Sequence, residues 1–181
     1  MNNKKPSLIK TLWQFLKGNK STFWTDKDLF FLRENNNYLD LLHKNNEQDV
    51  QSQDWTEIVS IPLEVFHKDR ENIYQFLFNY ISLSISCSQL TDFLDKNKFK
   101  ANRYLQIGGN KYYLRNNKNS IEILLSENNT QNNKEDKVIL ECKDNSYTKK
   151  DNLTNYFIDI LNHRWLDIEN EFRNLMRGYN Y

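Results

Sequence analysis

Few side chains in this sequence stand at spacings that could support metal binding. His163, Asp167 and Glu171 recur at four-residue intervals and would line one face of a helix, a spacing that could hold a divalent cation. Ion pairs on a solvated helix face produce the same spacing without a metal. No second cluster of His, Cys or acidic residues is evident in the sequence to complete a site. We therefore expect no metal site.

Candidates for acid–base or nucleophilic chemistry are equally sparse. Cys87 falls at an expected helix junction, where the positive end of a helix could depress the thiol pKa, but its apolar neighbours favour a buried structural cysteine. Asp92 and Asp95 could pair as acid and base, although the polar face of a short helix explains them equally well. The sequence thus predicts no catalytic residue and no cofactor, and it favours a protein that is not an enzyme. A catalytic site dispersed along the chain stays open.

The strongest local signal is a basic run at positions 97–118, which carries six cations and no anion. Within it, the segments 103–107 and 111–115 flank Gly108-Gly109-Asn110, a sequence that favours a tight hairpin turn. With Gly109-Asn110 as the two-residue loop, Ile107 would oppose Tyr112. Strand alternation would then gather tyrosines and cations on one face of the hairpin.

This face could bind a protein or a single-stranded nucleic acid. Aromatic side chains on a sheet can stack unpaired bases while cations neutralise phosphates, and aromatic residues with Arg also anchor protein interfaces. The residues expected to bind a nucleic acid or a protein partner are Lys98, Lys100, Tyr104, Lys111, Tyr113, Arg115 and Lys118.

The elements that must position this face follow from hydrophobic periodicity. Helices are expected at 7–17, at 25–42 (one interrupted helix or two short ones), at 73–85, from Ser88 to about Asn97, and from Asp151 to Gly178. Strands are expected at 59–65, 103–107, 111–115, 121–125 and 138–142. Because Pro62 cannot donate a ladder hydrogen bond, its strand should lie at a sheet edge or carry a bulge.

These elements predict an α+β fold in which an antiparallel meander sheet of about four to five strands packs with several helices, including a long C-terminal helix. At 181 residues, and with neither an internal repeat nor a dividing linker evident, one α+β domain over 1–181 is expected. It should carry a basic N-terminal helix and a mobile polar loop near 126–136.

Composition restricts the function further. The net charge of +1 argues against a general polyanion binder and leaves only a local basic patch. Cys87 and Cys142 lack CxxC spacing, which fits a reducing compartment. Because the N-terminus also lacks the pattern of a signal peptide, we expect a cytoplasmic protein.

The sequence favours a non-catalytic accessory or assembly subunit that acts by protein–protein docking, with another protein as partner. The alternative is a nucleic-acid-binding subunit of a ribonucleoprotein that uses the basic-aromatic hairpin 98–118. A small enzyme and a membrane-surface protein are weaker hypotheses. For the latter, the basic amphipathic N-terminal helix would contact lipid, but we favour a helix packed on its own domain.

Overall fold

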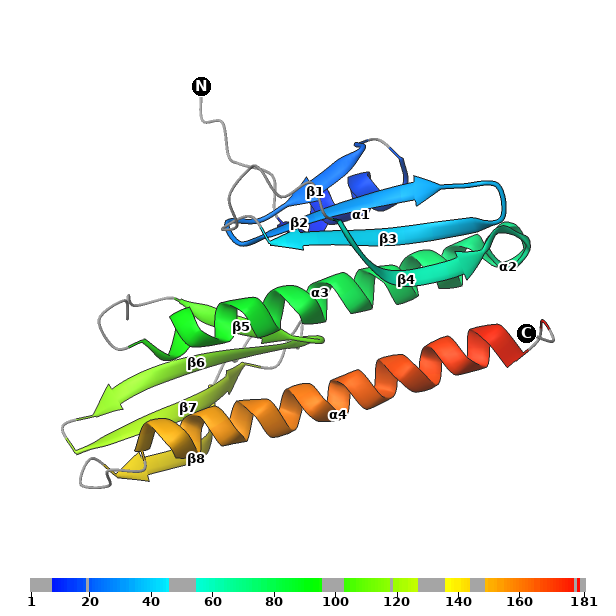
Figure 1. Cartoon of the computed structure of the whole chain (residues 1–181). Helices are drawn as coiled ribbons and strands as arrows, with labels where there is room; N and C mark the ends of the chain where they lie inside the picture. The colour runs from blue at the N-terminus through cyan, green and yellow to red at the C-terminus, as the bar shows by residue number, and fades with distance from the viewer. Residues whose placement is uncertain are drawn as a thin grey trace. The chain divides into compact units, whose positions relative to one another are not determined.

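A computed structural model describes residues 8–18, 20–45, 55–95, 103–117, 119–126, 136–143, 149–177 and 179. These residues form four helices and two antiparallel sheets of four strands each, which confirms the predicted α+β class (Figure 1). The chain divides into two compact units, one made of Met1–Ile81 with Ile168–Tyr181 and the other of Ser82–Asp167. The expectation of a single domain stays a prediction.

The first unit contains a four-stranded meander, where the sequence indicated a helix over 25–42 and a single strand over 59–65. Its strands are β1 (Thr22–Trp24), β2 (Asp28–Glu34), β3 (Tyr38–Asn45) and β4 (Thr56–Pro62), paired in that order. The predicted helix over 25–42 is therefore wrong. Two side chains build the turns that interrupt it: Thr25 Oγ1 accepts a hydrogen bond from the Asp28 amide at 2.9 Å, and Asn35 Oδ1 accepts one from the Tyr38 amide at 2.9 Å. Such local bonds favour turns over helix.

The inner face of this sheet forms the core of the first unit. Phe30, Leu41 and Ile61, one from each of three strands, have no exposed surface. The predicted N-terminal helix is confirmed as α1 (Leu8–Leu16), whose Phe15 lies 6.0 Å from Phe23 between ring centroids. This helix thus buries its apolar side on its own unit, as expected.

Two helices follow the first sheet. The predicted strand over 59–65 ends at Pro62, because α2 (Leu63–Lys68) begins there, and β4 is an edge strand as Pro62 predicted. The next helix, α3 (Arg70–Leu94), continues through the expected break at Ser88. The Ser88 hydroxyl donates to the Ile85 carbonyl at 2.9 Å, a bond within α3, and no new helix begins at this residue.

The second unit holds the antiparallel meander that the sequence predicted. It consists of β5 (Tyr104–Ile107), β6 (Asn110–Asn117), β7 (Ser120–Ser126) and β8 (Lys137–Lys143), followed by the long helix α4 (Lys149–Arg177). Phe157 of α4 is fully buried, with ring centroids 5.7 Å from Tyr112 and 5.5 Å from Phe93. The sheet face that carries Tyr112 is therefore the inner face. The expected loop near 126–136 falls almost entirely outside the described residues.

The last strand of each sheet contains a β-bulge. In the first sheet Leu41 pairs with Val59 and Leu42 with Glu57, so Ile58 is the extra residue. In the second sheet the same shift occurs between β7 and β8, where Ile139 is extra. Each bulge bends its strand locally and moves the following side chains to the other face.

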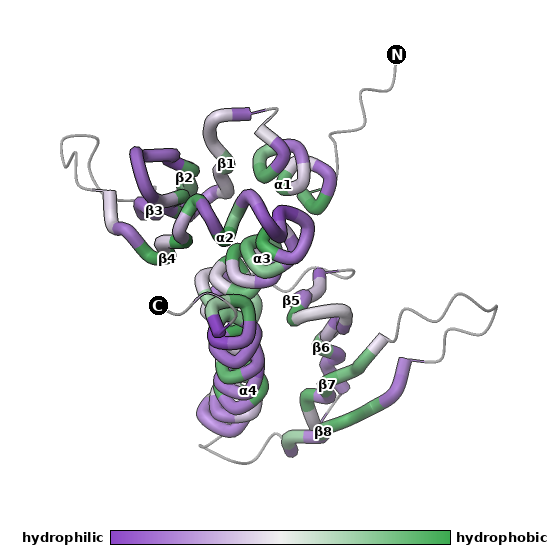
Figure 2. Tube along the Cα trace, turned by 90° about the vertical axis from the view of Figure 1, so that its right-hand side faces the viewer, coloured by the Kyte–Doolittle hydropathy of each residue, from purple (hydrophilic) through white to green (hydrophobic). Residues whose placement is uncertain are grey.

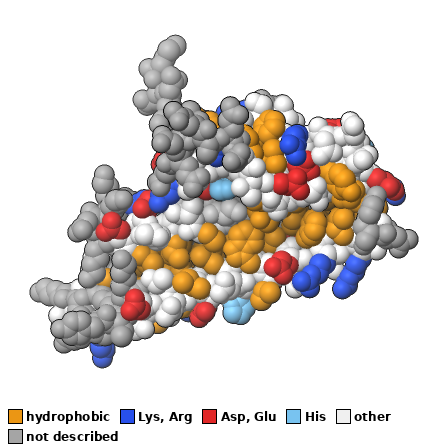
Figure 3. All heavy atoms as spheres, viewed as in Figure 1, with side chains coloured by type: hydrophobic (Ala, Val, Ile, Leu, Met, Phe, Trp, Pro, Cys, Tyr) orange, Lys and Arg blue, Asp and Glu red, His pale blue; other side chains and the backbone are white. Residues whose placement is uncertain are grey.

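The long helix α4 keeps some apolar side chains at the surface. Ile158 of α4 is 40% exposed and Leu166 is 57% exposed. Figure 2 shows hydrophilic and hydrophobic residues interleaved along α4, and Figure 3 shows hydrophobic side chains along the helices on the face that it presents. None of the described helices combines the length and the apolar character needed to cross a membrane.

Candidate docking surface on the second sheet

The predicted hairpin is confirmed, with a different turn. Gly108 and Gly109 form the two-residue turn, Gly108 has a φ of +61°, and Ile107 pairs with Asn110. Glycine adopts this left-handed conformation without steric cost. The turn therefore begins at Gly108, and Asn110, which was expected to be the second turn residue, is the first residue of β6. The register therefore differs by two residues from the expected one, and Ile107 does not oppose Tyr112. A shift of two leaves every side chain on its predicted face.

Four of the predicted binding residues share the outer face, opposite the face packed on α4: Tyr104, Lys111, Tyr113 and Arg115. The two tyrosine rings are directly paired across the strands, with centroids 5.7 Å apart. The Lys111 ammonium lies 5.0 Å from the centroid of the Tyr104 ring, within cation–π range. Lys98, Lys100 and Lys118 lie outside the described residues.

An apolar row crosses the outer face from one edge of the sheet to the other. Tyr104 pairs with Tyr113, Tyr113 with Leu124, and Leu124 with Val138. Tyr104 and Val138, on the two edge strands, are each 44% exposed, whereas Leu124 between them is 6% exposed. Leu124 and Val138 were missed as members of this face, because Leu124 directly follows the inward Ile123 and the bulge moves Val138 to the outer side.

The charges beside this row largely neutralise one another. Arg115 Nε donates to Glu122 Oε2 at 2.6 Å, and Asn117 Nδ2 donates to Glu122 Oε1. Glu141 stands next to Glu122 on the neighbouring strand and is exposed. Arg115, one of the cations expected to contact a partner, is thus already paired with Glu122, a carboxylate of the same face.

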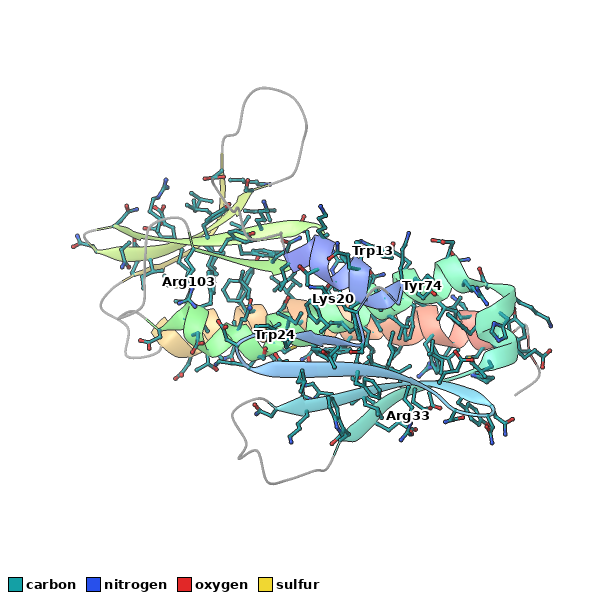
Figure 4. All side chains as sticks on the ribbon, turned by 90° about the horizontal axis from the view of Figure 1, so that it is seen from above. Trp13, Lys20, Trp24, Arg33, Tyr74 and Arg103 are labelled. Atoms are coloured by element: carbon teal, nitrogen blue, oxygen red, sulfur yellow. The ribbon has the colours of Figure 1, made fainter. Side chains whose placement is uncertain are left out.

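The outer face of the first sheet carries a second set of aromatic and charged side chains. Trp24 of β1 is 68% exposed, and the ring of Phe31 in β2 lies 5.8 Å from that of Trp55. Figure 4 labels Trp24 and Arg33 on this sheet. This face was not anticipated, because the region of β2 and most of β3 was expected to be helical.

Asp40 is the most buried charged group of that face, with its side chain only 1% exposed. Its Oδ2 accepts hydrogen bonds from Arg33 Nη2 at 2.9 Å and from Asn35 Nδ2 at 2.7 Å, and its Oδ1 accepts one from Ser60 Oγ at 2.7 Å. Burial acts to raise the pKa of Asp40. These hydrogen bonds and the charge of Arg33 outweigh burial, so the pKa lies below its ordinary value.

The three histidines lie in three different elements. His43 lies in β3 with its Nε2 2.9 Å from Asp28 Oδ1. His67 in α2 and His163 in α4 are exposed, and Nδ1 of His163 contacts the Asp159 carbonyl at 2.7 Å. Within the described ranges, no group of three or more His, Cys, Asp or Glu side chains could hold a metal ion.

The two cysteines differ in access. Cys87 was expected to be buried at a helix junction, but it lies inside α3 and is exposed, because its helical position faces away from the core. Cys142 of β8 is 7% exposed. Neither takes part in a disulfide.

Comparisons with known proteins return no relative: no family model matches the chain, and no curated protein and no solved structure is significantly similar to it.

Proposed function

We propose that this chain is a non-catalytic accessory or assembly protein that docks a protein partner on the outer face of its second sheet. The observation that carries the proposal is the apolar row Tyr104–Tyr113–Leu124–Val138. It crosses all four strands, and its two ends are 44% exposed. Aromatic side chains such as Tyr104 and Tyr113 are enriched among the anchors of protein interfaces.

The charges on this face indicate the chemistry of the partner. Arg115 is neutralised by Glu122, and the exposed Glu141 adds a further carboxylate. A polyanion would meet both carboxylates, whereas an apolar protein segment would meet the row itself. Lys111, beside Tyr104, then offers one cation for an acidic residue at the border of the partner's apolar segment.

A substitution pair with a matched control tests the docking surface. Tyr104→Ala combined with Val138→Ala removes the two exposed ends of the row, while Ile158→Ala with Leu166→Ala removes apolar side chains of comparable exposure from α4. The tagged full-length protein is incubated with nuclease-treated extract, and the stoichiometric partner that it retains is then measured with the purified variants. We expect at least about a tenfold loss of affinity for the sheet variant, because truncated interface anchors cost about 2 kcal/mol or more. An unchanged affinity, or an equal loss in the α4 control, would overturn the proposed surface.

The alternative is single-stranded nucleic acid, and the tyrosine pair with Lys111 is the observation that favours it. Two adjacent tyrosine rings and one nearby ammonium can stack bases and contact a phosphate. Fluorescence anisotropy with mixed single-stranded RNA and DNA at two salt concentrations separates the two functions. Saturable binding that Tyr113→Ala weakens by about 1–3 kcal/mol, with a smaller salt slope for Lys111→Ala, would replace protein docking by nucleic-acid binding. The docking proposal expects no saturable binding at low salt.

A further inference from the structure

The central hairpins of the two sheets correspond residue by residue. When each position of β2 and β3 is moved 82 places along the chain, the pair Arg33–Asp40 becomes the pair Arg115–Glu122, and both are cross-strand partners. The same shift relates other partners of similar chemistry: Phe30 and Tyr112, Phe31 and Tyr113, Leu32 and Leu114, Leu41 and Ile123, and Leu42 and Leu124.

The same three-residue clamp closes both hairpins. In the first, Arg33 and Asn35 both donate to the Asp40 carboxylate. In the second, residues 82 positions later repeat the arrangement, because Arg115 and Asn117 both donate to Glu122. A hairpin needs no such clamp to form, so its recurrence at one spacing is independent of the general strand pattern.

The architecture around the hairpins agrees with this correspondence. Ten residues separate β3 from β4, and ten separate β7 from β8. Each final strand has its bulge opposite matching partner residues, Leu41 and Leu42 in one sheet and Ile123 and Leu124 in the other. The bulged residues themselves, Ile58 and Ile139, are 81 positions apart, one fewer than the shift between the hairpins. Each sheet is an antiparallel meander in strand order, and a long helix follows each one, α3 after a short α2 in the first case and α4 in the second.

We infer that this chain is a tandem duplication of one unit, in which a bulged four-stranded meander precedes a long helix, and that both copies retain the Arg–Asn–carboxylate clamp. If the two copies share the clamp, the role of Arg115 and Asn117 is to stabilise the hairpin. The two outer faces then differ chemically at the positions where the copies have different residues, such as Leu29 in the first copy and Lys111 in the second. This inference does not depend on the proposed docking function.

A strand exchange within the full-length chain tests the duplication. The β6 sequence Asn110–Asn117 is replaced by the segment Asp28–Asn35, which is β2 with the residue that follows it, and this keeps Leu114, Arg115 and Asn117 in place. We expect a cooperative thermal transition with Tm within about 5 °C of the parent chain, because inward and outward side chains are preserved.

The matched control moves the same donor segment by one residue. Leu29–Asn36 placed at 110–117 puts arginine at the inward position 114 and glutamate at position 115, opposite Glu122. We expect this variant to lose more than about 10 °C in Tm or to lose its cooperative transition.

A variant with fewer substitutions shows whether any loss of Tm in the full exchange comes from a local packing defect. Tyr112→Phe, Tyr113→Phe and Asn116→Glu together carry only the aromatic and turn-side differences between the copies, and we expect a Tm within about 5 °C of the parent. Equal losses in the full exchange, the reduced variant and the shifted control would overturn the duplication. Retention of Tm by the shifted control as well would overturn it too, because any apolar strand would then serve.

Discussion

Asp40 offers the sharpest test of the forces that hold the first hairpin. The substitution Asp40→Asn keeps the side-chain volume but removes the charge that Arg33, Asn35 and Ser60 contact. The oxygen of the new amide can still accept a hydrogen bond, but its NH₂ group replaces the other carboxylate oxygen and cannot accept a hydrogen bond from the neighbouring donors. We expect a net loss of about 3 kcal/mol, since each hydrogen bond to a charged group contributes about 1.5–3 kcal/mol. The Arg33 contribution is discounted because that side chain is 49% exposed.

The assay is urea unfolding followed by circular dichroism at pH 7, with a thermal melt in parallel. A loss of 3 kcal/mol corresponds to a fall in Tm of about 6–12 °C for a chain of this size. The control is Glu57→Gln, because Glu57 lies 3.8 Å from Arg33 but is 52% exposed, and we expect less than about 0.5 kcal/mol for it. A loss below 0.5 kcal/mol for Asp40→Asn would refute the assigned role of this carboxylate.

The same pair of proteins carries a pH signature. The pKa of Asp40 is lower in the folded chain than its ordinary value, so the unfolded state binds the proton more readily. The stabilisation from Asp40 is therefore present in full above the unfolded pKa of about 3.9 and is lost as pH falls through the lower folded pKa. The gap in unfolding free energy between parent and Asp40→Asn should narrow between pH 5 and the acid limit. A gap that stays constant across this range would show that the charge is irrelevant.

Two further outcomes follow from burial in the second unit. Phe157→Ala should cost about 3–5 kcal/mol in urea unfolding, because Phe157 is fully buried against Tyr112 and Phe93; a cost below 1 kcal/mol would contradict this packing. Cys87 should react with a thiol reagent such as Ellman's reagent at least about tenfold faster than Cys142 in the native protein, because only Cys87 is exposed. The two rates should converge in urea, where both thiols are accessible, and equal rates in the native protein would refute the assignment.

The strands and the long helix of the second unit could be predicted from the sequence, because the turn residues and the hydrophobic periodicity indicate the same elements. Glycines mark the β5–β6 turn, apolar residues alternate at Ile121 and Ile123, and one long apolar stripe runs from Leu153 along α4. Each element therefore had one consistent period. The turn was misplaced by one residue because Gly108, Gly109 and Asn110 all tolerate the required backbone conformation, and only the packing of the strands decides among them.

The first unit was misread because two periods overlap in it. Leu29 and Leu32, and likewise Leu39 and Leu42, stand three apart, which indicates a helix, although the strands pair residue by residue. The run from Leu29 to Leu32 is apolar at every position, so it lacks the alternation of apolar and polar residues that would indicate a strand. The match between the two hairpins became visible only when cross-strand partners aligned them, since the clamp joins residues seven apart in each copy.

The candidate surface was only partly predictable for a related reason. Alternation placed Tyr104, Lys111 and Tyr113 on one face without any knowledge of partners across the sheet. Leu124 and Val138 joined them through the pairing of β7 with β8 and the bulge in it. Such membership depends on tertiary register, which local periodicity does not encode.

The two bulges also bear on how these sheets can meet other chains. A regular strand cannot keep its hydrogen-bond ladder along an edge in which one residue is out of step. In β4, Pro62 removes a further donor, and in β8, Lys137 and Lys143 place charge at both ends of an apolar strand. The edge strands β4 and β8 therefore disfavour pairing with a strand of another chain and edge-to-edge aggregation. A partner near these edges must bind side chains on a sheet face, because the backbone of the edge strand cannot form a regular ladder with it.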